Sequence, residues 1–245
     1  MAKFNEAKNI LVGASPLFLS AKDSTVSDYV RNMEPAAASS SGKPGVKFES
    51  TKSYIDTLNA STKFRNVGYT NNGLQITYNP TYDSVTVDQL LDTAKLFKSA
   101  MEVMIATELS EGTLENVLVV FGQGGVAEST TDITATSTLQ TEADYAAGTA
   151  EGKKVLGMAA GALGVQPVER QLIAVGNSPT TTDGTNNKTT ERVYYARRVL
   201  SVQQSQFSLA RTTPTTFPVT FRLLPDGDTT YAGQEYGKII DRIIA

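Results

Sequence analysis

The sequence predicts a mainly β protein with one short α-helix, and three patterns support this fold class. The first is an alternation of apolar and polar residues that runs through residues 66–79, 84–88 and 101–109. The second is the same alternation at 217–223, where every other residue is apolar: Phe217, Val219, Phe221 and Leu223. The third is a switch to a helical period at 113–122. Alternation of this kind is typical of antiparallel strands with one buried and one solvated face.

The first predicted strand runs from Ile10 to Leu19 and is bent by a glycine and a proline. From residue 20 to about residue 62 the periodicity disappears, and residues 36–45 are rich in Ala, Ser and Gly. Two interpretations of this long segment stay open: a surface loop, or an arm that orders only against another subunit. In the second case its apolar side chains are candidate inter-subunit contacts, among them Tyr29, Met33, Phe48 and Tyr54.

The central predicted strands each have one apolar and one polar face. We expect the polar faces to share one surface, and they carry six residues: Gln75, Thr77, Thr86, Asp88, Glu102 and Glu108. Residues 88–100 fit either a helix capped by Asp88 or a structured loop between strands. Asp88, Glu102 and Glu108 could form an acid/base cluster, but surface carboxylates are common on polar strand faces. An acidic wall is therefore the more useful interpretation.

The predicted helix begins after Thr113, a residue type that caps helix N-termini, and ends before Gly122. Its apolar residues follow the i, i+3, i+4, i+7 spacing of one helix face: Leu114, Val117, Leu118 and Phe121. Next comes a Thr/Ser/Ala-rich excursion at about 123–160, which fits a hairpin or a flexible segment. Strands follow at 167–176 and 192–209, and the amphipathic tail from Tyr236 fits either a strand or a helix.

Composition removes several classes of function. The 245 residues include no histidine and no cysteine, which excludes Ser-His-Asp triads, thiolate nucleophiles, disulfides and the usual zinc sites. The formal charge of −3 is too small to indicate binding to DNA phosphates. No apolar run approaches the ~20 residues of a membrane span. We expect a structural protein without catalytic residues, cofactor or metal.

Charge is unevenly distributed. Residues 61–165 carry 6 Lys+Arg against 12 Asp+Glu, a net of −6, whereas residues 166–245 carry 9 against 7, a net of +2. One hypothesis is that basic residues of the C-terminal third, above all Arg197 and Arg198, meet acidic residues of the middle third across subunit boundaries. Ion pairs of this kind add little affinity but help to select register.

Six phrases in order make the chain resemble the major tail (tail tube) proteins of long-tailed, non-contractile bacteriophages. The phrases are Asn66–Leu74, Val85–Asp92, Thr113–Leu118, Gly161–Gly164, Pro167–Arg170 and Phe217–Pro225. Residues 92–95 depart from the family pattern because they lack the proline expected there.

The resemblance implies one tail tube domain over residues 1–245. Its fold would be two packed antiparallel sheets, a β-sandwich or partly open barrel, flanked by one short α-helix. Subunits would form hexameric rings that stack into a tube, which delivers phage DNA without binding it specifically. The implied partners are other copies, the tape measure, tail terminator and distal tail proteins. The implied location is the virion, after assembly in the host cytoplasm and without membrane contact.

Under this resemblance the polar wall faces the lumen, where carboxylates would repel DNA phosphates and keep the genome sliding. Two alternatives remain. One is a related assembly protein of the same fold, such as a tail terminator or the tube of a contractile injection device. The other is a carboxylate-dependent enzyme on a β-sandwich, which would need two carboxyl groups facing each other across a cleft.

Overall fold

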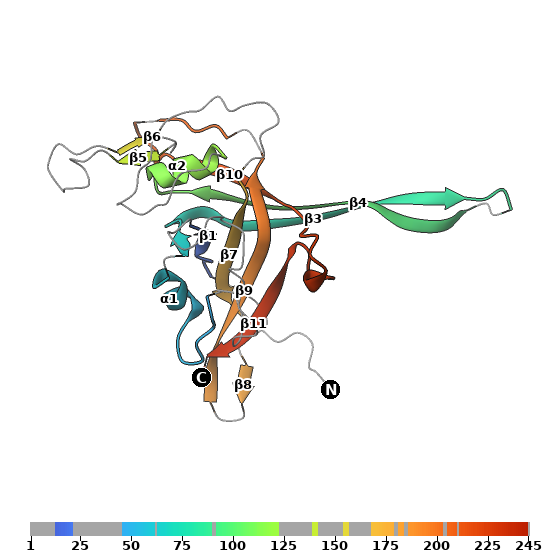
Figure 1. Cartoon of the computed structure of the whole chain (residues 1–245), viewed down its shortest axis with the longest axis horizontal. Coiled ribbons are helices and arrows are strands. Elements are labelled where there is room, and N and C mark those ends of the chain that lie inside the picture. Colours follow the sequence, from blue (N-terminus) through green and yellow to red (C-terminus); the bar gives the residue numbers. More distant parts are fainter. Residues whose placement is uncertain are drawn as a thin grey trace.

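The computed structural model describes residues 13–21, 46–61, 63–89, 92–122, 139–141, 154–156, 168–178, 181–183, 186–202, 205–209 and 211–244. These form a mainly β structure with two α-helices (Figure 1). The helices are α1 (Tyr54–Asn59) and α2 (Leu114–Val120), with a 3-10 turn at Thr229–Tyr231. The strands are β1 (Leu17–Ser20), β2 (Phe64–Asn66), β3 (Thr70–Thr86), β4 (Thr93–Leu109), β5 (Leu139–Thr141), β6 (Lys154–Leu156), β7 (Arg170–Asn177), β8 (Thr181–Asp183), β9 (Asn186–Ser201), β10 (Phe217–Leu223) and β11 (Gly237–Ile244).

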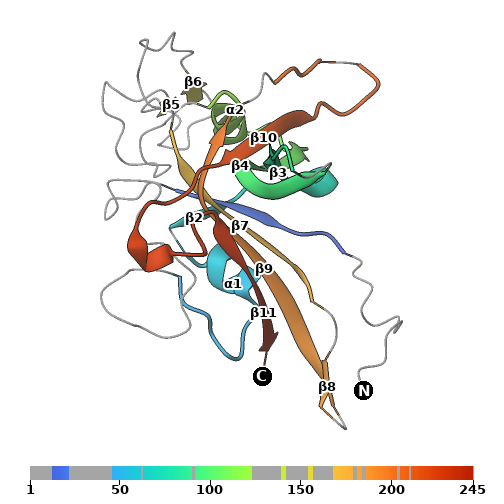
Figure 2. The same ribbon diagram turned by 90° about the vertical axis from the view of Figure 1, so that its right-hand side faces the viewer.

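Hydrogen bonding joins most of these strands into one antiparallel nine-stranded sheet with the order β2-β1-β7-β9-β10-β4-β3. The strands β8 and β11 also pair with β9, and β5 and β6 form a separate two-stranded ribbon. The long strand β9 therefore organises the fold. Its residues 189–196 pair with β11 and its residues 199–201 pair with β10, so β10 and β11 branch from β9 in succession. Figure 2 shows the two branches leaving β9 in different directions.

Two hydrophobic cores lie on the two faces of β1 and β7. Leu17 and Leu172 point into the first core, whereas their neighbours Phe18 and Ile173 point into the second. Both strands are buried on both faces, which explains why their sequences lack polar alternation. The first core also contains apolar residues of β4, β9, β10 and α2, so one continuous sheet curves around it. The second core is covered by α1.

The structure confirms the predicted helix at 113–122. The Thr113 side chain accepts a hydrogen bond from the backbone N–H of Asn116 at 3.3 Å, which satisfies one free donor of the first turn. Gly122 follows the helix at φ +66°, a conformation that glycine adopts without strain. The buried face is rotated from the predicted one, because Val119 and Val120 are buried and Phe121 is 38% exposed.

The expectation of a single helix was wrong, since α1 lies inside the segment 20–62 that showed no periodicity. Ser53 caps α1 by accepting from the N–H of Ile55, and Tyr54 and Leu58 are fully buried one turn apart. Residues 22–45, most of the predicted arm, lie outside the described part of the chain. Most of the predicted excursion at 123–160 lies outside it too, apart from the paired strands β5 and β6.

Two segments that fitted either of two structures become strands. Residues 93–100 belong to β4 and form no helix, and the tail 237–244 is the strand β11. The Asn72–Gly73 pair, which has the sequence of a hairpin turn, lies inside β3 as a bulge with φ values of 59° and 67°. The extra residues of a bulge bend a strand and increase its twist.

Candidate assembly surface

The strands β3 and β4 form a hairpin in which each strand has 17 residues, and its outer half projects from the body of the protein (Figure 1). β3 is the last strand of the sheet, so in the described part of the chain its outer edge has no paired strand. Pro80 lies within β3. An edge strand tolerates proline, because the backbone groups on its outer side form no hydrogen bonds to another strand and the missing N–H costs nothing there. An exposed edge of this length is a template for pairing with another chain.

The inner half of this hairpin, up to Thr81, has one apolar and one polar face. Ile76 pairs with Ile105 and faces the apolar side, whereas Gln75 and Thr77 pair with Ala106 and Met104 on the other side. Directly paired residues of an antiparallel ladder share a face, and neighbours along a strand alternate. The polar face of the inner half therefore carries four of the predicted wall residues together: Gln75, Thr77, Glu102 and Glu108.

The other two predicted wall residues lie elsewhere. Thr86 is the last residue of β3, paired with Thr93, and Asp88 lies in the turn at the far end of the hairpin. Gln75, Thr77, Thr86 and Asp88 are exposed, whereas Glu102 and Glu108 are partly buried. The pattern of alternation indicated correctly that Gln75 and Thr77 share a strand face, and likewise Glu102 and Glu108, but it contained no information on the distance of each residue from the body.

Neighbouring side chains modify the charge of this polar face. The strand β10 extends the face beyond β4, because Thr220 pairs with Ala106 and Arg222 with Met104. The Arg222 guanidinium lies 3.7 Å from the Glu102 carboxylate. Asn71 donates a hydrogen bond to Glu108 at 3.1 Å. Sequence reasoning missed Arg222 as a wall residue, although its alternation with Phe221 and Leu223 was the available signal.

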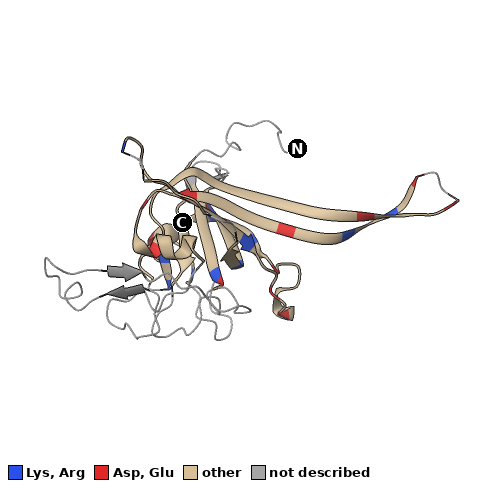
Figure 3. Cartoon of the chain, turned by 90° about the horizontal axis from the view of Figure 1, so that it is seen from above, with Lys and Arg blue, Asp and Glu red and all other residues tan. Residues whose placement is uncertain are grey.

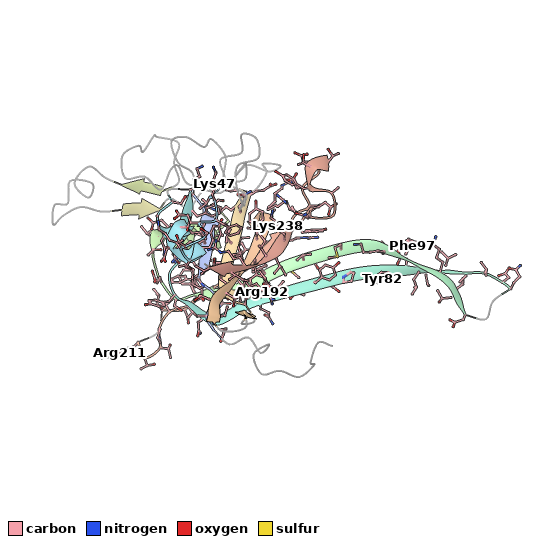
Figure 4. All side chains as sticks on the ribbon, turned by 90° about the horizontal axis from the view of Figure 1, so that it is seen from below. Lys47, Tyr82, Phe97, Arg192, Arg211 and Lys238 are labelled. Atoms are coloured by element: carbon pink, nitrogen blue, oxygen red, sulfur yellow. The ribbon has the colours of Figure 1, made fainter. Side chains whose placement is uncertain are left out.

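The outer half of the hairpin exposes large apolar side chains instead. Tyr82 is 57% exposed, Val85 42%, Leu96 63% and Phe97 46%. Figure 4 shows Tyr82 and Phe97 on the ribbon beyond the body, and Figure 3 shows acidic and basic residues interspersed along it. Solvent-exposed apolar groups in this number on a projecting element are typical of an interaction site.

An apolar groove of about 410 Å³ lies at the base of the hairpin, where it meets β9 and β11. The groove occupies the angle between the two branches of the sheet, and its lining includes three aromatic residues of the body: Tyr194, Tyr195 and Tyr236. Ile76 and Tyr78 line it from β3, and Ile239 lines it from β11. Lys238 is the one charged residue in the lining.

Two of the predicted inter-subunit residues pack inside their own chain. Tyr54 is fully buried, and its hydroxyl donates to the carbonyl of Val46 at 3.0 Å. Burial raises the pKa of Tyr54 far above its usual range. Phe48 packs on the Tyr54 ring at 4.4 Å between centroids. Tyr29 and Met33 lie outside the described residues.

Both predicted inter-subunit arginines also have partners within the chain. Arg197 is 2% exposed, donates to the Gln234 carbonyl at 2.9 Å and lies 3.6 Å from the centre of the Tyr231 ring. Arg198 makes a two-pronged contact with Glu169 at 2.6 and 2.8 Å. Glu169 is not in the acidic middle third. These contacts give both arginines a role in the fold itself, which the charge hypothesis did not include.

The described residues contain no group of histidine, cysteine, aspartate and glutamate arranged to hold a metal ion. Within the same ranges, no helix has the length and apolar character needed to cross a membrane. In the described part of the chain, this surface combines a strand edge without a paired strand, exposed apolar side chains and an apolar groove. Comparison of the chain with protein-family models gave no match, and neither did comparison with curated proteins.

Proposed function

We propose that this protein is a structural subunit that assembles with copies of itself into the tail tube of a long-tailed bacteriophage. The observation that carries self-assembly is the projecting β3–β4 hairpin, which exposes Tyr82, Leu96 and Phe97 to solvent. This arrangement is unfavourable for a monomer in water, because exposed apolar groups and an unpaired edge strand promote association. The assignment to a tail tube rests on the six phrases that resemble the tail tube family, in order along the sequence.

The edge of β3, which has no paired strand among the described residues, supports this proposal. When the β3 edge pairs with a strand of a neighbour, the sheets of successive subunits join, and closure of the ring leaves no edge exposed. The two packed sheets of the tail tube fold would then arise from the two sheet branches that leave β9, one with β10, β4 and β3 and one with β11. The inner branch would carry the polar wall of Gln75, Thr77, Glu102 and Glu108.

A wall of this composition suits a lumen through which DNA passes. Glu102 and Glu108 repel phosphates, and Gln75 and Thr77 offer hydration without fixed positive charge. Arg222 partly neutralises Glu102 and adds one positive charge to the same face. The wall is therefore mildly acidic, which favours passage over retention.

Negative-stain electron microscopy of the purified protein tests this function. We expect long tubes of uniform diameter with a central channel. Isolated rings that do not stack would instead favour a tail terminator of the same fold. A protein that stays monomeric at high concentration, without rings or tubes, would refute the assignment.

A further inference from the structure

The direction of the backbone groups in β3 follows from the hydrogen bonds of the neighbouring strands. The Thr220 carbonyl in β10 accepts a hydrogen bond from the backbone N–H of Val202 at 3.3 Å, on the side of β10 that faces β9. The backbone groups of Thr220 therefore point away from β4, and Thr220 forms a non-hydrogen-bonded pair with Ala106. The groups of Ala106 then point to the other side of β4, toward its partner Gln75 in β3.

This bond pattern assigns the backbone groups along the regular part of β3. The register with β4 is continuous from residue 75 to residue 81, so every second residue bonds to β4: Gln75, Thr77 and Asn79. Ile76, Tyr78 and Pro80 alternate with these residues and direct their groups to the outer edge. Proline has no N–H, so the position of Pro80 agrees with this assignment. The outer edge therefore offers an N–H and a C=O at Ile76 and at Tyr78.

Two features limit how much of this edge can pair with another strand. Before the regular part, β3 has the bulge at Asn72–Gly73, and the Gly73 carbonyl already accepts a hydrogen bond from the Thr107 hydroxyl at 2.8 Å. After it, Pro80 offers no donor. Bulges and prolines are devices by which edge strands restrict pairing with other chains. What remains is a short segment, residues 76–78, which we call the β3 window.

The outer edge of β11 also has no paired strand among the described residues. The backbone N–H of Val175 in β7 donates to the carbonyl of Pro16, just before β1, at 3.1 Å. The groups of Val175 therefore point away from β9, and those of its partner Val193 point toward β11, where Val193 pairs with Ile240. The residues that alternate with Ile240 direct their backbone groups outward: Ile239, Asp241 and Ile243.

We infer that the β3 window of one copy pairs antiparallel with the outer edge of β11 in a second copy. In this pairing Tyr78 lies opposite Ile239 of the second copy, and Ile76 lies opposite Asp241. The contact depends on the proposed function and names the two strands that meet in it.

Exposed side chains support β11 as the partner strand. Tyr78 is 66% exposed and Ile239 is 65% exposed, and both belong to residues whose backbone groups point outward. Directly paired residues share a face of the sheet, and a pair of an aromatic and a β-branched side chain is favourable. Asp241 brings no unpaired charge to this face, because it forms an ion pair with Arg192.

The donors of the two strands favour this register. Pro80 then lies opposite Gly237, whose N–H already donates to the Gln234 carbonyl at 3.1 Å. The pairing therefore ends at a position where neither strand has an N–H to give.

The geometry of a tube favours β11 over a second β3 edge. Two β3 windows that pair with each other are related by a two-fold axis, and such a contact stops at a dimer. Pairing of β3 with β11 joins two different edges, so each copy offers both and the contact continues into a ring or a filament. Every subunit of a closed ring is then held at two places.

A proline variant tests the hydrogen bonds of the β3 window. Tyr78→Pro removes one outward N–H together with the phenol ring, and Tyr78→Ala is the matched control that removes the ring and keeps the N–H. Both monomers should keep the wild-type circular dichroism, since an edge strand tolerates proline on its outer side. Tyr78→Pro should need a protein concentration for assembly that is roughly ten-fold or more above that of Tyr78→Ala, because its partner carbonyl loses a donor.

Introduced cysteines test the partner strand, because the chain itself contains none. Opposite residues of a hydrogen-bonded pair lie about 5.5 Å apart between Cα atoms, within the range of a disulfide. In Ile76→Cys/Asp241→Cys, mild oxidation should produce a ladder of multimers on a non-reducing gel that a reductant abolishes. The matched control pairs Ile76→Cys with Asp56→Cys, an exposed residue of α1, and should produce no such ladder.

The outcomes separate this contact from the proposed function. Wild-type assembly with equal cross-linking in the two cysteine pairs, or equal assembly of Tyr78→Pro and Tyr78→Ala, overturns the pairing of β3 with β11 and leaves the proposed function intact. A wild-type protein that never assembles overturns both.

Discussion

Replacing Glu191 by glutamine tests how the body of the protein is held together next to the hairpin. Glu191 lies on β9, is 5% exposed, and accepts hydrogen bonds from the Tyr54 N–H at 3.0 and 3.1 Å and from the Ser53 hydroxyl at 2.9 Å. The Arg242 Nε lies 2.7 Å from the same carboxylate without hydrogen-bond geometry, so this contact acts as an ion pair. One buried carboxylate thus links α1, β9 and β11.

The loss of unfolding free energy in Glu191→Gln depends on which interactions of the carboxylate the glutamine side chain retains. The amide retains the shape and one acceptor oxygen, but it leaves the Arg242 cation, whose side chain is 10% exposed, without an opposite charge. Removal of one partner from a buried pair costs about 3–5 kcal/mol. Arg242 keeps its bond to the Glu49 carbonyl at 2.9 Å, which offsets part of this loss. We expect a loss of about 2–4 kcal/mol, since hydrogen bonds to charged groups contribute about 1.5–3 kcal/mol each. For a chain of this size the midpoint of thermal unfolding should fall by roughly 5–15 °C.

Urea unfolding of the dilute, unassembled protein, followed by circular dichroism, provides the measurement. The double variant Glu191→Gln/Arg242→Gln should lose less than the sum of the two single variants, because removing both charges leaves no unpaired ion. Asp241→Asn is the matched control, since Asp241 pairs with Arg192 on the surface and its side chain is 49% exposed. That variant should lose at most about 1 kcal/mol. Equal losses for Glu191→Gln and Asp241→Asn, or strict additivity in the cycle, would show that the buried pair contributes nothing special.

Three further predictions concern the core, the wall and pH. Ile173→Ala should destabilise the monomer by about 2–5 kcal/mol, because Ile173 is fully buried. The matched control Ile76→Ala, at a position that is 44% exposed, should cost the monomer far less in urea unfolding. The double variant Glu102→Lys/Glu108→Lys should form tubes that retain DNA in a salt-dependent manner, whereas wild-type tubes release it in the same filter-binding assay. The hydrogen bond from its arginine partner holds the pKa of Asp241 below its usual range. The stabilising contribution of Asp241 is therefore present above the unfolded pKa of about 3.9 and is lost as pH falls through the folded pKa. The difference in unfolding free energy between wild type and Asp241→Asn should vanish in acid.

The alternation of apolar and polar residues predicted those strands that have one face in the core and the other face in solvent. The alternation of Val103 and Ile105 with Glu102, and the regular face of 217–223, reported one core face and one solvated face correctly. The helix α2 was predictable because its caps are local, with Thr113 before it and Gly122 after it. These signals depend only on neighbours in sequence.

The features that sequence reasoning missed depend on distant residues or on two-sided surfaces. The short helix α1 lacks a repeating apolar face, and Glu191, more than a hundred residues away, fixes its first turn. Arg197 was interpreted as an inter-subunit residue because sequence cannot show that Tyr231 and the Gln234 carbonyl enclose it. Residues 93–100 show no two-residue period, because both faces of the outer half of the hairpin carry apolar groups. Their sequence therefore fitted a helix as well as a loop.

Loss of alternation along one hairpin therefore has a structural meaning that bears on assembly. Up to Thr81 the strands keep one mainly apolar and one mainly polar face, and beyond it both faces carry apolar side chains. In the described part of the chain no strand pairs with the outer edge of β3, so under the proposed self-assembly this edge is open to a strand of another copy. Under the same proposal, the exposed apolar side chains of the outer half of the hairpin and the β3 edge give each subunit two separate surfaces for contact with other copies, as a tube of stacked rings requires.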